Sequence, residues 1–132
     1  MTTDAGIETE YFGGRARLIA CSSQTDERGV LLPFYFNQMP FAPCRSFAIT
    51  NVPAGVVRGG HAHRSGMQML VCLHGRIEIL MRYQDEEATL VMEPSSFSLV
   101  FGPGVWCQQR YATEGSVLLV FASEPYDPKS YL

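Results

Sequence analysis

The sequence contains few positive charges and no long hydrophobic run, and these two absences exclude whole classes of partner. Lysine and arginine number 10 against 13 acidic residues, which gives a net charge of -3, and the basic residues are scattered. Because a nucleic-acid-binding face needs clustered basic side chains, we expect no nucleic acid partner. No apolar run approaches the roughly 20 residues of a membrane span, so we expect no membrane partner either.

The four cysteines follow no metal-binding or disulfide pattern. They are Cys21, Cys44, Cys72 and Cys107, and no CxxC pair occurs among them. Cys72 lies in an apolar run and is predicted to be a core thiol. The N-terminal segment contains acids and lacks the apolar stretch of a signal peptide. Together these features predict a cytoplasmic protein, since thiols persist in a reduced compartment.

The chain also lacks a sustained helical repeat, which argues against helices over most of its length. Turn-forming residues instead recur about every ten residues, and short runs rich in β-branched and aromatic residues lie between them. We expect strands at residues 45–52, 67–73, 76–83, 88–92, 96–101 and 116–122. This pattern is typical of an all-β sandwich or barrel, and we expect residues 1–132 to form one such domain. A small closed barrel or jelly roll can hold one small ligand in its mouth.

The most informative segment is Arg58–Gln68, which reads RGGHAHRSGMQ. On a strand, His61 and His63 point to the same side because side chains alternate between the two faces. Two imidazoles therefore converge on one face, and the glycines just before them allow a bend or a close backbone approach. Three interpretations are open: the pair has no chemical role, it binds a metal, or it performs acid–base catalysis.

The metal interpretation is based on spacing. The first cupin motif has a His-x-His pair and then a glutamate, at the position where this chain has Gln68. The second cupin motif has proline-glycine, two residues and a histidine, and here that histidine is replaced by Cys107. Two of the four usual ligands are therefore replaced, although a Cys107 thiolate would still suit a soft metal.

The acid–base interpretation needs no metal. Histidine titrates near neutral pH, so it can take up a proton and return it. Moving a carbonyl along a sugar requires removal of a proton next to the ketone, formation of an enediol, and delivery of a proton to the neighbouring carbon. One or two histidines, together with a hydrogen-bond donor to the developing oxyanion, would suffice.

Further blocks accompany the histidine segment along nearly the whole chain. They are Asp26–Leu31, Pro40 and Phe41, Arg45, Gln68–Gly75, Gly102–Trp106, and Val117–Ser123 followed by Tyr126 and Tyr131. Taken together, these blocks resemble the WxcM-like sugar 3,4-ketoisomerases, cupins that act on dTDP-4-keto-6-deoxyglucose in bacterial glycan and antibiotic-sugar pathways. The resemblance implies a cupin-type jelly-roll β-barrel, a homodimer, no metal or other cofactor, and a dTDP-linked nucleotide sugar bound in the barrel.

The resemblance also implies roles for individual residues. The catalytic histidines of the family map to His61 and His63, and we expect His63 to be the main base. Arg45 and Arg58 would bind the sugar or the diphosphate, because a guanidinium group matches phosphate geometry. Gln68 would lie in the lumen as a neutral hydrogen-bonding group, which fits a barrel that has given up its metal.

The chain departs from the family at a hydroxyl group. The family pairs its histidine with a tyrosine on the strand after the first arginine, and this chain has Phe47 and Ala48 there. We expect Tyr35, from another segment, to replace that hydroxyl in the substrate-binding set. Trp106 and Cys107 complete the set. Trp106 would either pack at the rim or stack on the base, and Cys107 would be either a reactive thiol beside the histidines or an inert buried one.

Three functions follow from these patterns. The first is a nucleotide-sugar isomerase that moves the keto group between C4 and C3 of a dTDP-4-keto-6-deoxyhexose by metal-free acid–base catalysis through an enediol. The second is a metal-dependent cupin enzyme that uses His61, His63 and Cys107. The third, suggested by Phe47, is a non-catalytic module that binds a nucleotide sugar.

Overall fold

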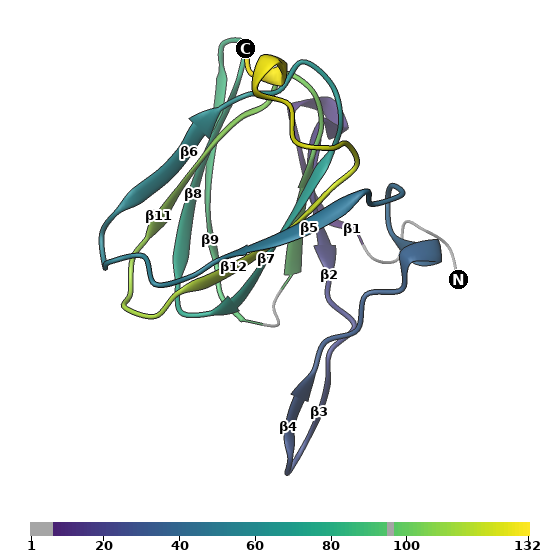
Figure 1. Ribbon diagram of the computed structural model, residues 1–132, viewed down its shortest axis with the longest axis vertical. Helices are drawn as coiled ribbons and strands as arrows, with labels where there is room; N and C mark the ends of the chain where they lie inside the picture. The colour runs from purple at the N-terminus through teal and green to yellow at the C-terminus, as the bar shows by residue number, and fades with distance from the viewer. Residues whose placement is uncertain (1–6, 95–96) are drawn as a thin grey trace.

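The chain folds into antiparallel β-sheets, two of which pack against each other (Figure 1). The computed structural model describes residues 7–94 and 97–132. The larger sheet has six strands in the order β1 (Ile7–Tyr11), β2 (Ala16–Ala20), β10 (Phe97–Phe101), β7 (Gln68–His74), β12 (Val117–Ala122) and β5 (Arg45–Ile49). The smaller sheet has four strands in the order β6 (Val57–His61), β11 (Trp106–Tyr111), β8 (Ile77–Tyr83) and β9 (Glu86–Met92).

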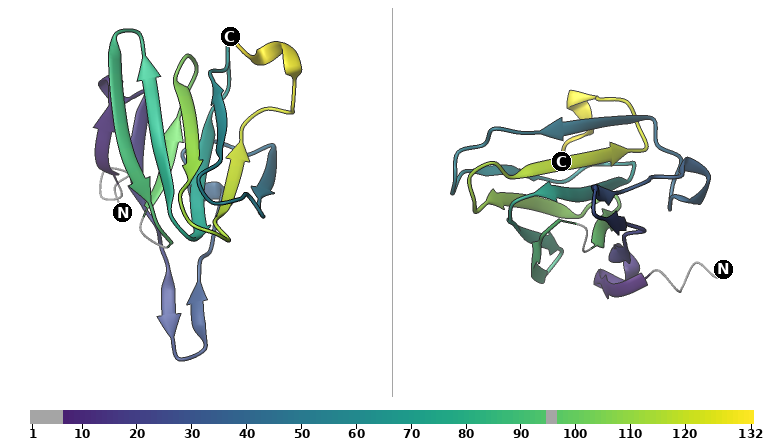
Figure 2. Two further views of the ribbon diagram at one scale, coloured as in Figure 1. Left: turned by 90° about the vertical axis from the view of Figure 1, so that its left-hand side faces the viewer. Right: turned by 90° about the horizontal axis from the view of Figure 1, so that it is seen from below.

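The remaining elements are short. A two-stranded hairpin, β3 (Gln24–Asp26) and β4 (Gly29–Leu31), extends away from the two sheets, as Figures 1 and 2 show. Three 3-10 turns, η2 (Phe12–Gly14), η3 (Phe36–Gln38) and η4 (Pro128–Ser130), are the only helical elements of the described residues. None of the described helical elements is long and apolar enough to cross a membrane.

The predicted all-β jelly roll is confirmed, with one refinement and several additions. Within the described residues the six expected strands are all present, with ends that differ by up to a few residues, but six others were missed; residue 96, where one expected strand begins, lies outside the described residues. Within the described residues no strand pairing joins the six-stranded sheet to the four-stranded one, so the expected barrel is a two-sheet jelly roll without hydrogen-bonded closure. Strand β6 escaped prediction because Gly59 and Gly60, at φ of 75° and 82°, interrupt its apolar pattern.

The main core lies between the two sheets and follows from strand alternation. On β8, Ile77, Ile79 and Met81 are at most 2% exposed, while the residues between them lie nearer the surface. They face buried side chains of the larger sheet, such as Leu70 and Leu118. Burying each side chain of this size contributes about 1.5–3 kcal/mol. This core fixes the relative position of the strands that carry the histidines and Gln68.

A second apolar cluster covers the outer face of the larger sheet. Its fully buried members are Met69, Val71, Val100 and Phe121, and the segment of residues 32–41 packs over them. The Phe34 ring, for example, lies 4.8 Å from the Phe121 ring, centroid to centroid. Strand β12 therefore contributes side chains to both clusters, which agrees with its continuous apolar run VLLVF.

The C-terminal segment returns to the histidines. After β12 the chain passes through η4 and ends beside the start of the loop after β6 (Figure 1). The Leu132 N–H donates to the Ala62 carbonyl at 2.9 Å, and the Arg64 N–H donates to the Ser130 carbonyl at 2.7 Å. His63 and Tyr131 form an isolated antiparallel bridge between these two bonds. The tail is thereby fastened, like a short extra strand, to the segment that carries both histidines.

Candidate functional site

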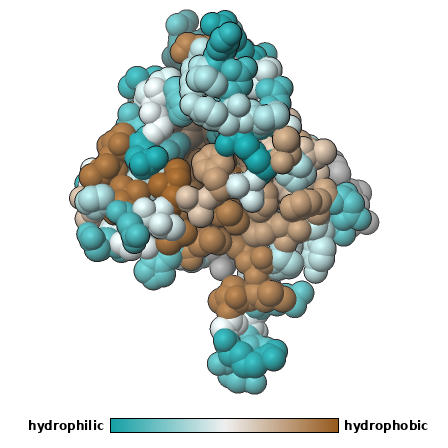
Figure 3. All heavy atoms as spheres, in the orientation of Figure 1, coloured by the Kyte–Doolittle hydropathy of each residue, from teal (hydrophilic) through white to brown (hydrophobic). Residues whose placement is uncertain are grey.

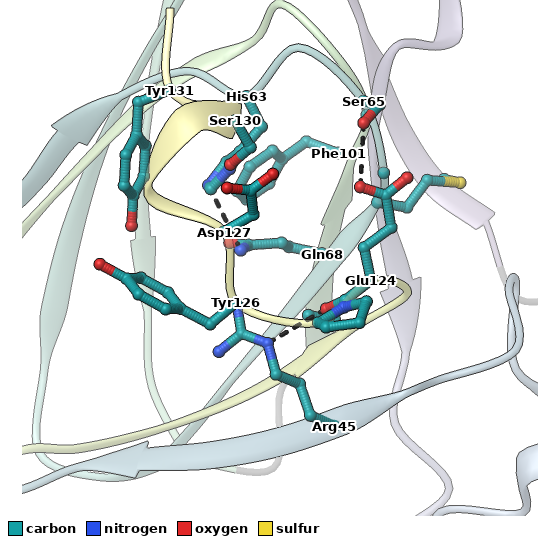
Figure 4. A pocket seen from close by; sticks show the side chains of 15 residues that line it. Arg45, His63, Ser65, Gln68, Phe101, Glu124, Tyr126, Asp127, Ser130 and Tyr131 are labelled. Carbon is teal, nitrogen blue, oxygen red and sulfur yellow. Dashed lines mark hydrogen bonds between the residues drawn. The ribbon is translucent and has the colours of Figure 1, made fainter.

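A pocket with polar walls lies where the C-terminal segment meets β5 and β7 (Figure 4). Arg45 enters it from the start of β5 and Gln68 from the start of β7, while His63 comes from the loop after β6. The C-terminal segment supplies the opposite wall. Its lining residues are Glu124, Pro125, Tyr126, Asp127, Ser130 and Tyr131. The pocket therefore collects cationic, acidic, amide, hydroxyl and imidazole groups from four separate parts of the sequence.

The two histidines lie side by side, as their spacing predicted. Their ring centroids are 5.3 Å apart, and the ring planes are tilted by 47°. Tyr131 packs against both rings, with its centroid 4.4 Å from that of His61 and 4.9 Å from that of His63. His63 lines the pocket, and His61 reaches it through these ring contacts. The arrangement makes a compact aromatic cluster of two imidazoles and one phenol.

Both ring nitrogens of His63 have polar neighbours. Nδ1 lies 3.0 Å from the Ser130 hydroxyl oxygen, and Nε2 lies 3.4 Å from the amide nitrogen of Gln68. The imidazole is therefore held from two sides, by the C-terminal turn and by the first residue of β7. A ring held in this way cannot rotate freely, which suits a group that must meet a substrate atom in a fixed direction.

The surroundings keep both histidines neutral at neutral pH. Burial lowers the pKa of His61 below its ordinary value of 6.5. Burial also lowers the pKa of His63, and the nearby charges of His61 and Arg45 add to this effect, while the Glu124 carboxylate opposes it. A neutral imidazole has a lone pair that can accept a proton, so His63 is ready to act as a base at pH 7.

Arg45 brings a positive charge to the pocket. Its Nε donates to the Glu124 carbonyl at 3.1 Å, as the dashed line in Figure 4 shows. Its guanidinium carbon lies 5.0 Å from the centroid of the Phe47 ring and 5.8 Å from that of Tyr126. The two aromatic faces and the carbonyl bond fix the plane of the guanidinium group. A guanidinium held beside a polar pocket is suited to binding a phosphate group.

Other predicted site residues lie outside this pocket. Arg58 is exposed on β6, and Tyr35, with 54% of its surface exposed, precedes η3 beside the outer cluster. Trp106 is half-buried, and the Arg82 guanidinium lies 4.9 Å from its ring. None of these three lines the pocket that holds His63, so their roles in binding stay predictions.

Cys107 is a buried, protonated thiol. It pairs with His61 across β11 and β6, and its side chain accepts a bond from the Gln109 amide at 3.6 Å. The residue is 2% exposed, and burial raises the pKa of its thiol to about 12. Of the two interpretations of Cys107 given above, these features favour the inert buried thiol. Cys72 is likewise buried, at 1% exposure, as predicted.

The donor set does not fit a metal ion. In the part of the chain that the structure describes, no three His, Cys, Asp or Glu side chains come together as a ligand group. Gln68 offers a neutral amide where a cupin metal site has a carboxylate, and a protonated Cys107 is a poor ligand. No catalytic step below is therefore assigned to a metal.

Sequence reasoning missed several residues of the pocket, Glu124, Asp127 and Ser130 among them. Ser130 had no signal of its own, because a serine near the end of a chain is unremarkable in composition. Tyr126 and Tyr131 were expected to fasten the C-terminal tail and were not predicted as members of the site. Tyr131 lies against both histidines and Tyr126 near Arg45, and these positions depend on the path of the tail, which local periodicity does not encode.

Comparison with known proteins places these features in a family context. Residues 15–132 match the family model described as FdtA, WxcM-like, C-terminal. The chain is 30% identical over 108 residues to the TDP-4-oxo-6-deoxy-alpha-D-glucose-3,4-oxoisomerase of Aneurinibacillus thermoaerophilus, covering 81% of this chain and 78% of that protein.

Solved structures agree with the sequence match. One is the 3,4-ketoisomerase QdtA from Thermoanaerobacterium thermosaccharolyticum, solved as a histidine-to-asparagine mutant in complex with TDP-4-keto-6-deoxyglucose. It is 36% identical to this chain with a TM-score of 0.85, and the match covers 89% of this chain and 86% of that one. The TDP-quinovose 3,4-ketoisomerase WlaRB from Campylobacter jejuni is 25% identical with a TM-score of 0.82, covering 89% of this chain and 91% of that one.

Proposed function

The chain belongs to the FdtA family of WxcM-like C-terminal domains, and from this premise we propose that it is a nucleotide-sugar isomerase. It moves the keto group between C4 and C3 of a dTDP-4-keto-6-deoxyhexose. The observation that carries the proposal is the pocket itself, where a neutral, doubly held His63 lies beside an amide donor and a guanidinium group. These are the three kinds of group that an enediol mechanism on a nucleotide sugar requires.

His63 is the proposed base. Its Nε2 removes the proton from C3 of the 4-ketose, and the electrons of that C–H bond form a C3–C4 double bond while the C4 oxygen becomes an enediolate oxygen. Gln68, whose amide nitrogen lies 3.4 Å from Nε2, donates to that oxygen. The C4 oxygen takes up the hydroxyl proton of C3 and becomes a hydroxyl group, and the protonated His63 returns its proton to C4, which leaves the carbonyl at C3. No proton or electron is gained or lost overall, so the reaction needs no redox cofactor.

Substrate binding is assigned to the cation of the pocket. Arg45 faces the pocket with a guanidinium plane fixed by two aromatic rings, and it is the proposed partner of the diphosphate or the sugar. Arg58, Tyr35 and Trp106 stay proposed members of the wider binding set, whereas Cys107, which is buried, is proposed only to support it from the core as the strand partner of His61. The identity of the nucleotide as dTDP is supported by the relatives, whose structures contain TDP or a TDP-sugar.

A homodimer is also part of the proposal. The β3–β4 hairpin extends from the body with Val30 and Leu31 55% and 60% exposed, and Figure 3 shows hydrophobic surface at its root. An isolated two-stranded hairpin is only marginally stable in water, so this one needs a partner surface. A second copy of the chain would supply it. The cytoplasmic location and the single domain over residues 1–132 likewise stay proposals.

The test separates binding from turnover at one residue. The substrate TDP-4-keto-6-deoxyglucose is incubated with the wild-type protein and with His63→Asn, and the product is identified by proton NMR. We expect a 3-keto product from the wild type, at least about a hundredfold loss of turnover in His63→Asn, and similar affinity of the two proteins by calorimetry. Tight binding without turnover by the wild type would instead identify a binding module, the function suggested by Phe47.

A further inference from the structure

The C-terminal turn holds Ser130 rigidly against His63. Asp127 caps η4 by accepting from the Lys129 N–H at 2.9 Å, and its carbonyl accepts from the Ser130 N–H at 3.0 Å. The Ser130 carbonyl accepts from the Arg64 N–H at 2.7 Å. Both backbone groups of Ser130 are therefore fixed. Its hydroxyl oxygen consequently lies at a defined position, 3.0 Å from His63 Nδ1.

The neighbours of His63 determine which of its nitrogens carries the proton. At Nε2 the neighbour is the amide nitrogen of Gln68, which can only donate a hydrogen bond. Nε2 must therefore accept, so it carries the lone pair of the neutral ring. Nδ1 then carries the hydrogen and donates it to the Ser130 oxygen, which can accept. The lone pair at Nε2 is the one that removes a proton in the mechanism proposed above.

His61 is in the opposite situation. Its Nδ1 is buried, and within the described part of the chain it has no hydrogen-bond partner. A buried N–H without an acceptor is rarer in proteins than a buried acceptor without a donor. Nδ1 of His61 therefore keeps its lone pair, and the hydrogen lies on Nε2. The two neighbouring imidazoles thus carry their hydrogens on different nitrogens, Nδ1 in His63 and Nε2 in His61.

We propose that Ser130 is a positioning residue that, by accepting from Nδ1, stabilises the tautomer of His63 that the Gln68 amide also favours, so that the lone pair of the base stays on Nε2. This inference rests on the proposed isomerase function. Ser130 acts only through His63 and need not touch the substrate. A hydroxyl group is neutral, so it orients the ring without attracting the positive charge that forms when His63 takes up a proton. The imidazolium form is therefore free to return its proton within the same turnover.

The test reads the tautomer directly. The 132-residue chain is uniformly labelled with 15N, and two-bond proton–nitrogen correlation spectra are recorded at a pH well above 6.5 for the wild type, Ser130→Ala and Ser130→Thr. Lys129→Ala is the matched control, because Lys129 is exposed in the same turn and only its backbone takes part in the recorded hydrogen bonds. The same four proteins are assayed for kcat and KM with TDP-4-keto-6-deoxyglucose.

We expect His63 to show a protonated Nδ1 in the wild type, in Ser130→Thr and in Lys129→Ala, and a mixture of both forms in Ser130→Ala. Ser130→Ala should lose about 10- to 100-fold in kcat with little change in KM, which is the loss typical of removing the partner that orients a metal-ligating histidine and which we expect here for a catalytic one. A proton on Nε2 in the wild type would overturn the inference, and so would an unchanged tautomer in Ser130→Ala. If the wild type has the expected tautomer but no turnover, the proposed function has failed while the role of Ser130 in setting the tautomer stands.

Discussion

Replacing Gln68 by glutamate tests whether the Gln68 amide donates a hydrogen bond to Nε2 of His63, and it hardly changes the shape of the side chain. The variant exchanges one donor amide for a carboxylate that can only accept. Nε2 of His63, which lies 3.4 Å from the Gln68 amide nitrogen, would then have to carry the proton and donate it. The lone pair needed for proton removal would move to Nδ1, on the side of Ser130. The variant should therefore fold normally and lose its base.

The size of the loss follows from the same geometry. A hydrogen bond to a charged group contributes about 1.5–3 kcal/mol, and this bond must break before Nε2 can accept a proton. Each 1.36 kcal/mol is a factor of ten, so kcat on the pH plateau should fall roughly 10- to 150-fold. The negative charge of the glutamate, at 3.4 Å from Nε2, also stabilises the protonated His63 ring, by about 1.2 kcal/mol at the dielectric constant of water. The pKa of His63 therefore rises, and the acid limb of the pH profile moves to higher pH.

The assay is a pH profile of kcat and of kcat/KM, followed by NMR of the product. Gln84→Glu is the matched control, because it makes the same chemical change at an exposed turn between β8 and β9. The control should keep the wild-type profile. A Gln68→Glu protein with the wild-type plateau and an unmoved acid limb would refute the assignment of Gln68 as donor to Nε2.

Three further outcomes follow from the structure. For the wild type, kcat/KM should fall as the pH drops below 6.5, because the pKa of His63 is lowered and its protonated form is not a base. The free energy of unfolding should fall over the same range, since the unfolded chain binds the proton more readily. An acid limb of the kcat/KM profile that lies above pH 7 would contradict this assignment. Treatment with a chelator should leave kcat unchanged, with less than stoichiometric metal by elemental analysis; a loss of activity restored by one metal would favour the metal-dependent alternative. Gly75→Ala should lower the free energy of unfolding, measured in urea, by roughly 1–3 kcal/mol. At this position φ is +82°, and the new Cβ would lie 2.8 Å from Ser116 Cα. In the control Gly102→Ala the new Cβ meets nothing within 4 Å, so the free energy of unfolding should hardly change.

The sequence predicted those parts of the molecule that depend on local alternation. The buried set of β8 could be read from Ile77, Ile79 and Met81, and the same rule placed His61 and His63 on one face. Strands with mixed patterns were not recognised: β11 carries consecutive glutamines, and β3 and β4 have only three residues each. Short or polar strands are held by their neighbours in the sheet rather than by their own propensity.

The site was predicted only where its members are close in sequence or match a family block. Gln68 and Arg45 were expected near the histidines, and the structure brings both to the pocket of His63. Ser130 lies 67 positions from His63 in the chain, and nothing in its local sequence indicates the contact. The hydroxyl role expected of Tyr35 stays a prediction, since Tyr35 precedes η3 and does not line this pocket. The fold brings a different tyrosine, Tyr131, to the histidines.

The measurement that tests the central claim most directly is proton NMR of TDP-4-keto-6-deoxyglucose with the metal-stripped protein in heavy water. If His63 removes the C3 proton, the C3 signal of the substrate disappears as a 3-keto product forms, and neither change occurs with His63→Asn. The product carries hydrogen at C4 if His63 returns the proton directly, and deuterium if that proton exchanges with the solvent first. Retention of the C3 proton by the wild type, with no product while the ligand signals still broaden on binding, would contradict the account. The pocket would then belong to a protein that binds a nucleotide sugar without isomerising it.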